Sequence, residues 1–359
     1  MSAKSNQTAC IKVPKKQGEK VIALANKLGI LDKSLAILRD ENNLCMPIVR
    51  QLQETEVSFL REQIPNIEFT ANSFVKKKQT PETLFQALQG ELPPNLLSSI
   101  PQAFDIIGDI VIIEIPPELE PHQTLIGDAI LKTHKNVKTV LAKAGDINGA
   151  YRIRNYTFVA GERTTRTVHK EFGCQFYVDI AKAYFSPRLS HEHNRIASLV
   201  QSGEAVVDLF SGVGPFSVLI ARKNPNVRVY AVDLNPDAVE LLKVNVKVNR
   251  VENRVIPMLA DAREIVKTKL KSTCDRAIMN LPETAIDFVD AACDVLKQEG
   301  GVVHFYGFVR SPESIDTLKR RFTDLVEKNG RKVGKFLYAK SIRETAPFES
   351  QVVLDAKIL

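Results

Sequence analysis

The stretch VVDLFSGVGPFS, residues 206–217, decides the fold of this chain. Its apolar start ends on Asp208, a turn containing Gly212 and Gly214 follows, and a helical pattern begins beyond the turn. Glycine allows the positive φ and the close backbone approach that a ligand needs at such a turn. In doubly wound sheets, ligands bind beyond the carboxyl ends of the strands, where the first strand-to-helix turn is often glycine-rich. The stretch therefore predicts the first strand and the ligand-binding turn of a parallel sheet.

From residue 191 the chain shows a regular alternation of strand and helix patterns. The strand patterns are EAVVDLF, RVYAVDL, VIPMLAD, CDRAIMN and GGVVHFYGF, and helical patterns such as DAVELLKVNVKVN, AIDFVDAACDVLKQ and SIDTLKRRFTDLVEKN lie between or after them. This alternation predicts a Rossmann-like α/β domain. The final stretch, KVGKFLYAKSIRETAPFESQVVLDAKIL, holds two strand patterns with no room for a crossover helix. We expect an antiparallel hairpin on the sheet edge, which gives a mixed sheet of seven strands.

Two smaller parts precede this domain, as a length of 359 residues allows. Residues 1–72 place the helical pattern KQGEKVIALANKLGILD between the strand patterns ACIKV and NLCMPIV, which predicts a small N-terminal αβ domain. Lys76, Lys77, Lys78 and Pro81 are typical of a charged linker. Residues 80–188 combine strand and helix patterns with the β-rich runs YRIRNYTFVAG and TVHKEFGCQFYVDI, which predicts a middle α+β domain. The Rossmann-like domain then occupies residues 189–359.

Composition excludes several classes of protein. Hydrophobic residues make up 44% of the chain and charged residues 25%, as in ordinary globular proteins, and the apolar runs are too short to span a bilayer. The first residues lack the apolar segment of a secretion signal, so we expect a cytoplasmic protein. The five cysteines are widely spaced without a C-x-x-C pair, which indicates neither a disulfide framework nor a zinc site.

The positive charge is concentrated in two segments of the chain. The total is +7, but residues 1–80 carry 13 basic and 8 acidic residues, and residues 131–200 carry 12 basic and 5 acidic residues. Residues 81–130 between them hold eight acidic residues and no basic one. A polyanion such as nucleic acid would meet the two basic segments. The alternative, that the lysines only keep the protein soluble, explains the total charge but not this segregation.

Three successive strand patterns end in an aspartate, Asp208, Asp233 and Asp261. A carboxylate at the first of these positions would repel the pyrophosphate of a dinucleotide, which disfavours NAD. S-adenosylmethionine has no phosphate, and a carboxylate suits its sulfonium and amino groups. Asp233 would then bind the ribose hydroxyls and Asp261 would lie near the adenine amino group. Each aspartate alone could be a helix N-cap, but three in register favour a site for S-adenosylmethionine.

The fourth strand pattern ends on NLPETA, residues 280–285. Proline keeps the residue before it extended, so the polar groups of Asn280 and Leu281 should lie free at the end of the strand. Beside the cofactor, the polar groups of Asn280, Leu281 and Pro282 could bind a planar base. The alternative is that Pro282 only occupies the first turn of the next helix.

Four segments together resemble a known family: YRIR, HKEFGCQFYVDIAKAYFSPRLSHEHNRI, VVDLFSGVGPFSV and NLPETA. They are similar to the archaeal and eukaryotic type tRNA (guanine-N1)-methyltransferases, which act on guanosine 37 beside the anticodon. The resemblance covers nearly the whole chain. It implies a small N-terminal domain that contacts tRNA, a middle domain and a methyltransferase domain that binds S-adenosylmethionine.

The resemblance also assigns roles to individual residues. N1 of neutral guanine carries a proton, so methylation requires a base, and the matching residue is Glu192. Arg152 matches the residue that stabilises the base oxygen as negative charge develops there. Tyr184 matches an active-site tyrosine, and the substrate contacts are Arg152, Arg188, Asn280 and Pro282. The residues expected to bind the cofactor are Asp208, Phe210, Gly212, Gly214, Asp233, Leu234, Asp261, Ala262 and Asn280.

Several of these roles have alternatives. A helix N-terminus beside Glu192 would weaken it as a base unless desolvation compensates, and His191 and His193 flank it. Arg152 could instead be a phosphate contact, and Arg188 could either bind phosphate or do no more than brace its loop. The target base must leave its stack, which costs less in an anticodon loop than in a duplex. The chain has no tryptophan, so stacking would use Tyr, Phe, His or Arg.

Competing functions remain at the level of sequence. One is a methyltransferase or aminocarboxypropyl transferase that acts on a tricyclic wyosine-type derivative at position 37, but the intact NLPETA favours simple guanosine. Another is a tRNA-binding protein without turnover, which the retained Glu192 and Arg152 disfavour. The third, a dehydrogenase, is disfavoured by Asp208. We expect a monomeric enzyme with tRNA as its partner and no bound metal.

Overall fold

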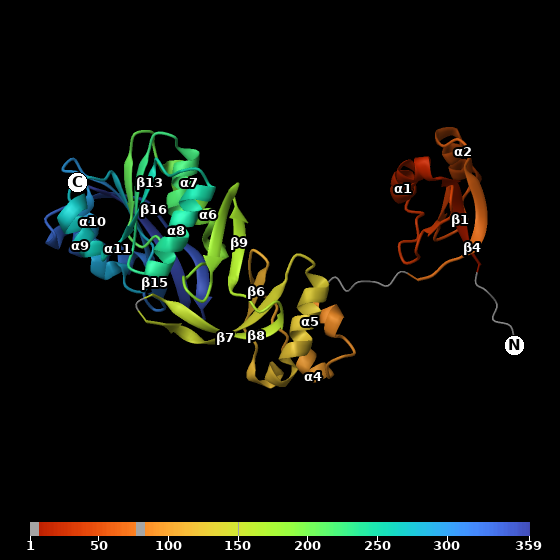
Figure 1. Cartoon of the computed structure of the whole chain (residues 1–359), viewed down its shortest axis with the longest axis horizontal. Coiled ribbons are helices and arrows are strands. Elements are labelled where there is room, and N and C mark those ends of the chain that lie inside the picture. Colours follow the sequence, from red (N-terminus) through yellow and green to blue (C-terminus); the bar gives the residue numbers. More distant parts are fainter. Residues whose placement is uncertain (1–6, 77–82, 150) are drawn as a thin grey trace. The chain divides into compact units, whose positions relative to one another are not determined.

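The computed structural model describes residues 7–76, 83–149 and 151–359. The chain forms two compact units, residues 1–81 and 82–359 (Figure 1). Three residues of the expected linker, Lys77, Lys78 and Pro81, lie outside the described residues. The boundary that we expect near residue 188, inside the second unit, stays a prediction.

The first unit is a four-stranded sheet with two helices. β1 (Gln7–Pro14) pairs antiparallel with β3 (Asn43–Pro47) and with β4 (Glu68–Ser73), and β2 (Leu38–Arg39) continues beyond β3. Helices α1 (Gly18–Lys27) and α2 (Glu54–Gln63) bury Val21 and Leu60 in one core with Ile11 of β1. This core contains no residue of the second unit, so the first unit has a hydrophobic core of its own.

The second unit begins with a smaller sheet in the order β5-β6-β7-β8. Its strands are β5 (Asp105–Ile107), β6 (Ile110–Ile113), β7 (Thr139–Asn148) and β8 (Ile153–Gly161). Helices α3 (Leu84–Leu88), α4 (Pro94–Leu97) and α5 (Gln123–Thr133) and the 3-10 helix Pro117–His122 accompany it. α5 packs closely, since a Cβ on its Gly127 would collide with Val159 and Ala160 of β8. The run TVHKEFGCQFYVDI forms a separate hairpin of β9 (Arg166–Glu171) and β10 (Cys174–Asp179).

The larger sheet of the second unit has seven strands in the order β13-β12-β11-β14-β15-β17-β16. The parallel strands are β11 (Ala205–Asp208), β12 (Arg228–Asp233), β13 (Val255–Leu259), β14 (Arg276–Met279) and β15 (Gly301–Arg310). β16 (Val333–Ala346) and β17 (Glu349–Ile358) form the antiparallel hairpin. The α/β fold class and the mixed seven-stranded sheet are therefore confirmed.

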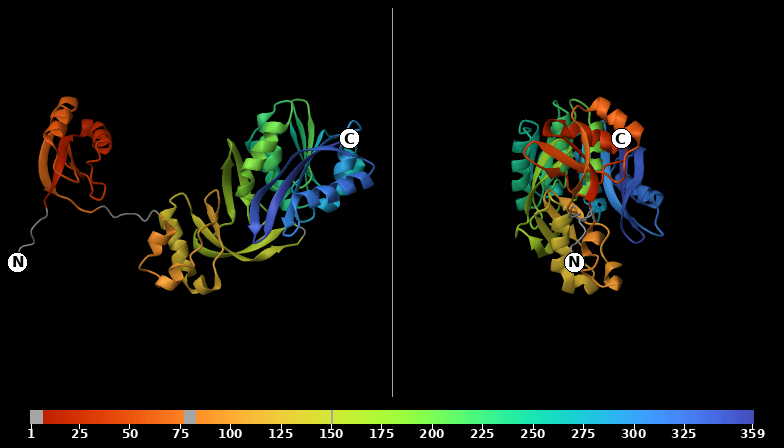
Figure 2. Two further views of the ribbon diagram at one scale, coloured as in Figure 1. Left: turned by 180° about the vertical axis from the view of Figure 1, so that it is seen from behind. Right: turned by 90° about the vertical axis from the view of Figure 1, so that its right-hand side faces the viewer.

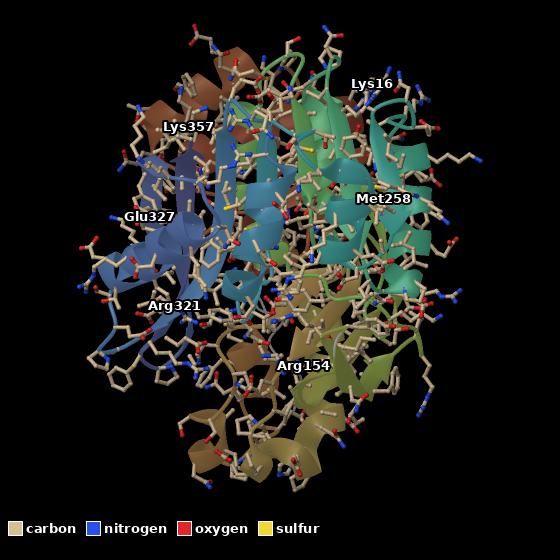
Figure 3. All side chains as sticks on the ribbon, turned by 90° about the vertical axis from the view of Figure 1, so that its left-hand side faces the viewer. Lys16, Arg154, Met258, Arg321, Glu327 and Lys357 are labelled. Carbon is tan, nitrogen blue, oxygen red and sulfur yellow. The ribbon has the colours of Figure 1, made fainter. Side chains whose placement is uncertain are left out.

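Helices cover both faces of this sheet (Figure 2). α6 (Ser190–Leu199), α7 (Pro215–Lys223) and α8 (Pro236–Val248) share a core with Val206, and α9 (Ala262–Ile265), α10 (Val289–Val295) and α11 (Ile315–Lys328) share another with Val207. Consecutive strand residues point to opposite faces, so one strand serves both cores. On α11, Arg321 and Glu327 point outward (Figure 3), whereas Phe322 is buried.

Some boundaries differ from the sequence patterns. The pattern AIDFVDAACDVLKQ forms a 3-10 turn, Ala285–Phe288, followed by α10, which ends at Val295. Between α9 and β14 the chain adds a π-helical turn, Val266–Leu270, that no sequence pattern indicates. Within the described ranges, no helix is long and apolar enough to cross a membrane. All five cysteines are free and buried.

Candidate active site

A cavity of about 310 Å³ opens at the carboxyl ends of the parallel strands. Its wall includes the loops after β11, β12, β13 and β14, residues 151 and 152 just before β8, and the 3-10 helix Pro187–Leu189 before α6. Most of the site residues expected from the sequence line it: Arg152, Tyr184, Phe210, Gly212, Asp233, Leu234, Asp261, Ala262, Asn280 and Pro282. The structure thus brings residues that are up to 130 positions apart in the chain to one cavity, as expected for a switch point of an α/β sheet.

The glycine-rich turn has the geometry that its sequence predicts. Gly212 and Gly214 have φ of 52° and 88°, and Gly214 caps the N-terminus of α7. The N–H of Ser211 donates to the carbonyl of Val232 at 2.8 Å, and this bond fixes the turn against β12. Gly214 itself does not line the cavity. A Cβ at this position would collide with Leu242, so the glycine allows the start of α7 to pack against α8.

The three aspartates take three different positions. Asp233 lines the cavity, and its carboxylate accepts hydrogen bonds from the N–H groups of Gly212 at 2.7 Å and Asn235 at 2.9 Å. Burial raises the pKa of Asp233 above its ordinary value, although these bonds oppose the shift. Asp261 lines the cavity and also caps α9, accepting from the N–H groups of Arg263 and Glu264. N-capping and ligand contact are therefore compatible at this position.

Asp208 lies behind the turn and does not line the cavity. It is completely buried; Ser217 of α7 donates a hydrogen bond to Oδ2 at 2.8 Å, while Oδ1 has no partner among the described residues. Desolvation raises the pKa of Asp208 to about 7. The geometry therefore gives Asp208 a bracing position under the turn, rather than the direct ligand contact that we expect from the sequence.

The loop after β14 presents one unpartnered polar atom to the cavity. Asn280 lines the cavity, and its side-chain Oδ1 is buried without a hydrogen-bond partner among the described residues. The expectation of free polar groups is wrong for Leu281, whose carbonyl accepts from the N–H groups of Thr284 and Ala285. Those bonds close a turn after Pro282 and hold Asn280 at the end of the strand.

Arg152 and Tyr184 line the cavity next to each other. Arg152 has a positive φ of 54°, which is uncommon for a residue with a side chain. Its guanidinium lies 5.6 Å from the centre of the Tyr184 ring, and its Nη1 forms an ion pair of 2.7 Å with Glu283. Glu283 belongs to NLPETA, so this pair joins two of the motifs that the sequence separates by more than 100 residues.

Glu192 is buried and does not line the cavity. Arg195 donates to both oxygens of its carboxylate at 2.9–3.0 Å, and the Tyr306 hydroxyl donates to Oε2 at 2.9 Å. Arg195 also pairs with Asp355, which accepts a further bond from His304. Glu192 is therefore one end of a buried ionic network that extends from α6 to β15 and β17.

The two histidines beside Glu192 differ in position. His193 lines the cavity, and its Nδ1 lies 2.7 Å from Oε1 of Glu171, a buried carboxylate in β9. The His193 ring also contacts the edge of Phe216 with a centroid distance of 4.5 Å. His191 is exposed and does not line the cavity. Of the three residues 191–193, only His193 reaches the cavity directly.

Arg188 also lies away from the cavity wall. Its Nε donates to Oδ1 of Asp105 in β5 at 2.5 Å. This ion pair ties the loop before α6 to the smaller sheet, which supports the bracing alternative for Arg188. Among the described residues, no group of His, Cys, Asp and Glu could hold a metal ion.

Several cavity residues are absent from the expectations based on sequence. Phe288, whose ring lies 5.0 Å from that of Phe210, and Tyr151 add to the aromatic lining. Phe308, Arg343 and Gln351 come from β15, β16 and β17, where they occupy neighbouring positions in the register. The sequence carries no signal for this last group, because only the order of strands in the sheet brings them to the cavity.

Comparison with known proteins places the chain in a family. Residues 167–334 match the model of the TRM5/TYW2 methyltransferase domain, residues 84–164 the TYW2 N-terminal domain, and residues 10–56 the tRNA methyltransferase 5 N-terminal domain. The chain is 39% identical to tRNA (guanine(37)-N(1))-methyltransferase Trm5b of Pyrococcus abyssi, over 98% of this chain and 99% of that protein. It is 36% identical to Trm5b of Methanocaldococcus jannaschii, over 97% and 98%.

A further relative and the solved structures agree. The chain is 34% identical to tRNA 4-demethylwyosine(37)-methyltransferase Taw21 of Saccharolobus solfataricus, over 77% of this chain and 99% of that protein. A complex of aTrm5 with tRNALeu superposes with a TM-score of 0.76 at 34% identity, over 98% of this chain and 99% of the other. The crystal structure of Trm5b from Pyrococcus abyssi gives a TM-score of 0.72 at 37% identity, with the same coverage. The chain therefore belongs to the TRM5/TYW2 family of tRNA methyltransferases.

Proposed function

We propose that this protein is a tRNA (guanine(37)-N1)-methyltransferase, which transfers the methyl group of S-adenosylmethionine to N1 of guanosine 37. The observation that carries the proposal is that the glycine-rich turn, Asn280 and Arg152 meet in one cavity. The Trm5b relatives match over 97–98% of this chain, whereas the demethylwyosine methyltransferase matches over 77%. This difference favours guanosine methylation over action on a wyosine-type derivative.

The cavity residues fit S-adenosylmethionine. Asp233 presents a carboxylate for ribose hydroxyls, while Phe210 and Phe288 offer aromatic surface for an adenine ring. The unpartnered Oδ1 of Asn280 can accept a hydrogen bond from a ligand, which relieves the cost of burying it alone. When bound, the cofactor supplies an electrophilic methyl group on a sulfonium. Asp208 stabilises the turn from behind and does not contact the ligand.

Arg152 and Asn280 are the proposed contacts to the target base. Nη1 of Arg152 pairs with Glu283, but the guanidinium carries further N–H groups that can donate to the base oxygen. Negative charge develops on that oxygen as N1 loses its proton, so a fixed cation there lowers the barrier. Tyr184, beside Arg152, offers an aromatic ring at the mouth of the cavity.

Glu192 is the proposed general base. His193 is the alternative, and it is favoured by its own position in the cavity wall. Glu192 does not line the cavity, so its side chain must move before it can accept the N1 proton, and Arg195 can stay paired with Asp355 when this happens. His193 lines the cavity already, and Glu171 can orient its ring. Glu192→Gln and His193→Asn separate the two residues: the variant that removes the base should lose about 10²–10⁴-fold in kcat and keep its affinity for the cofactor.

The reaction is tested with labelled S-adenosylmethionine and two unmodified tRNA transcripts, one with guanosine and one with adenosine at position 37. Label on the guanosine transcript alone supports the proposal. Label on neither, although both bind, contradicts it and favours a wyosine-type substrate. The cytoplasmic location and the monomeric state stay predictions.

A further inference from the structure

The tip of the C-terminal hairpin, residues 345–349, holds an aromatic side chain in solvent. Phe348 is 84% exposed, more than any other large apolar side chain of the described residues. Its φ is +64°, a left-handed conformation that bulky residues rarely adopt. The ring contributes little to the stability of the hairpin, because only apolar surface that is buried from water stabilises a fold. Residues held in sparsely populated backbone conformations are concentrated at functional sites.

The hairpin tip is held firmly by its neighbours. The N–H of Ser311 donates to the carbonyl of Phe348 at 2.9 Å, which fastens the tip to the loop between β15 and α11. The Thr345 hydroxyl donates to Oε1 of Glu349 at 2.7 Å, and Arg310 pairs with the same carboxylate. The Phe348 backbone is therefore fixed, and its ring is presented to solvent from a defined position.

This position lies at the same end of the sheet as the cavity. Phe308, Gln351 and Arg343 occupy neighbouring positions across β15, β17 and β16, and all three line the cavity. Phe348 is three residues before Gln351 in the chain, about 10 Å farther in the direction of the turn. The C-terminal hairpin (blue) and the β7–β8 ribbon (yellow-green) approach each other in both Figures 1 and 2.

We propose that Phe348 is a stacking platform for an unpaired nucleotide of the tRNA that lies next to the target guanosine. This inference rests on the proposed function. A target base that leaves its stack deprives its neighbours of a stacking partner, and proteins that bind single-stranded RNA supply aromatic rings for such bases. Phe348 lies just outside the cavity that takes the target base, so the occupant that fits it is an adjacent loop nucleotide.

The absence of tryptophan from this chain gives a direct test of binding. Phe348→Trp would carry a single tryptophan, and its fluorescence should be quenched when a full-length tRNA with guanosine 37 binds. Leu337→Trp is the matched control, because Leu337 is an exposed residue of β16 far from the tip. A signal at position 337 that equals the signal at position 348, or no signal at 348 on saturation with tRNA, contradicts the proposal.

Kinetics test whether the contact is aromatic stacking. Phe348→Ala and Phe348→Leu should raise KM for tRNA about 10-fold, while the Kd for S-adenosylmethionine and the thermal midpoint stay unchanged, and Phe348→Tyr should restore the parental KM. Leu337→Ala should behave like the parent. If the parent methylates guanosine 37 and Phe348→Ala matches it in KM, the inference fails while the proposed function stands. A change in oligomeric state of Phe348→Ala, measured by sedimentation, would instead assign the ring to contact with a second copy of the chain.

Discussion

Asp208 is fully buried, and Ser217 is the one hydroxyl that donates to its carboxylate among the described residues. Asp233, in the corresponding place on the next strand, faces the cavity and accepts two backbone N–H bonds. Both aspartates follow strands of similar composition. The difference between them arises from neighbouring side chains: α7 covers Asp208, whereas the loop after β12 leaves Asp233 at the cavity.

The burial of Asp208 predicts a pH dependence of stability. Its pKa rises from an ordinary 3.8 to about 7 on folding, so the folded chain keeps a proton that the unfolded chain releases. The proton bound to Asp208 therefore stabilises the folded chain at low pH, and this stabilisation is lost as the pH rises from about 4 through 7. Asp208→Asn should remove ~2–4 kcal/mol of the difference in unfolding free energy between pH 5 and pH 8. Urea denaturation at both pH values measures it.

A matched control is available for this prediction. Asp316 is an exposed aspartate at the start of α11, so Asp316→Asn removes one negative charge from the surface and is the control for the change of charge alone. If Asp208→Asn and the parent lose equal stability between pH 5 and pH 8, folding does not raise the pKa of Asp208 and the prediction is wrong.

At the scale of elements, α6 turns adjacent residues to different environments. About 100° of rotation separates consecutive residues of an α-helix. Glu192 consequently faces Tyr306 and Arg195, and His193 faces the cavity and Phe216. A base at position 192 needs a movement of its side chain, whereas a base at position 193 does not. The comparison of Glu192→Gln with His193→Asn is therefore also a test of whether the buried network opens during the reaction.

The start of α7 carries a prediction about packing. Gly214 has a φ of 88°, and a Cβ there would collide with Leu242 of α8. Gly203 has the same φ with open space around it, so it is a control for the backbone strain alone. Gly214→Ala should cost about 1–3 kcal/mol more than Gly203→Ala in the free energy of unfolding, and it should also weaken binding of S-adenosylmethionine. An equal loss of unfolding free energy in the two variants would show that Leu242 of α8 can move aside for the added methyl group without strain.

At the scale of the whole molecule, the chain combines two units with independent cores. The cavity and its lining lie entirely in residues 82–359, and the first 80 residues contribute 13 basic against 8 acidic side chains. Phosphate contacts dominate the affinity of proteins for nucleic acids, so a separate basic unit can add affinity for tRNA without any part in the chemistry.

This division predicts the behaviour of a truncated protein. Residues 82–359 alone should fold and bind S-adenosylmethionine with the Kd of the full chain, because all cavity residues and their core are present. KM for tRNA should rise at least 10-fold, and its increase with salt concentration should be less steep. Calorimetry with the cofactor and kinetics at two salt concentrations measure both effects. An unchanged KM would mean that the first unit does not contribute to tRNA binding.

The sequence by itself determined the alternation of strands and helices, the glycine-rich turn and the motifs of the family, because these depend on local patterns. It also determined that Asp233, Asp261 and Asn280 lie at or just beyond the carboxyl ends of strands on one side of a sheet, since parallel strands share their carboxyl ends. Tertiary structure alone decided that these three groups face the cavity and that Asp208, at the end of the first strand, does not. Pairing of β15 with β17 and β16 brought Phe308, Gln351 and Arg343 to the cavity, and packing of α6 turned Glu192 away from it. Contacts between distant segments set the environment of a side chain, and no local pattern encodes them.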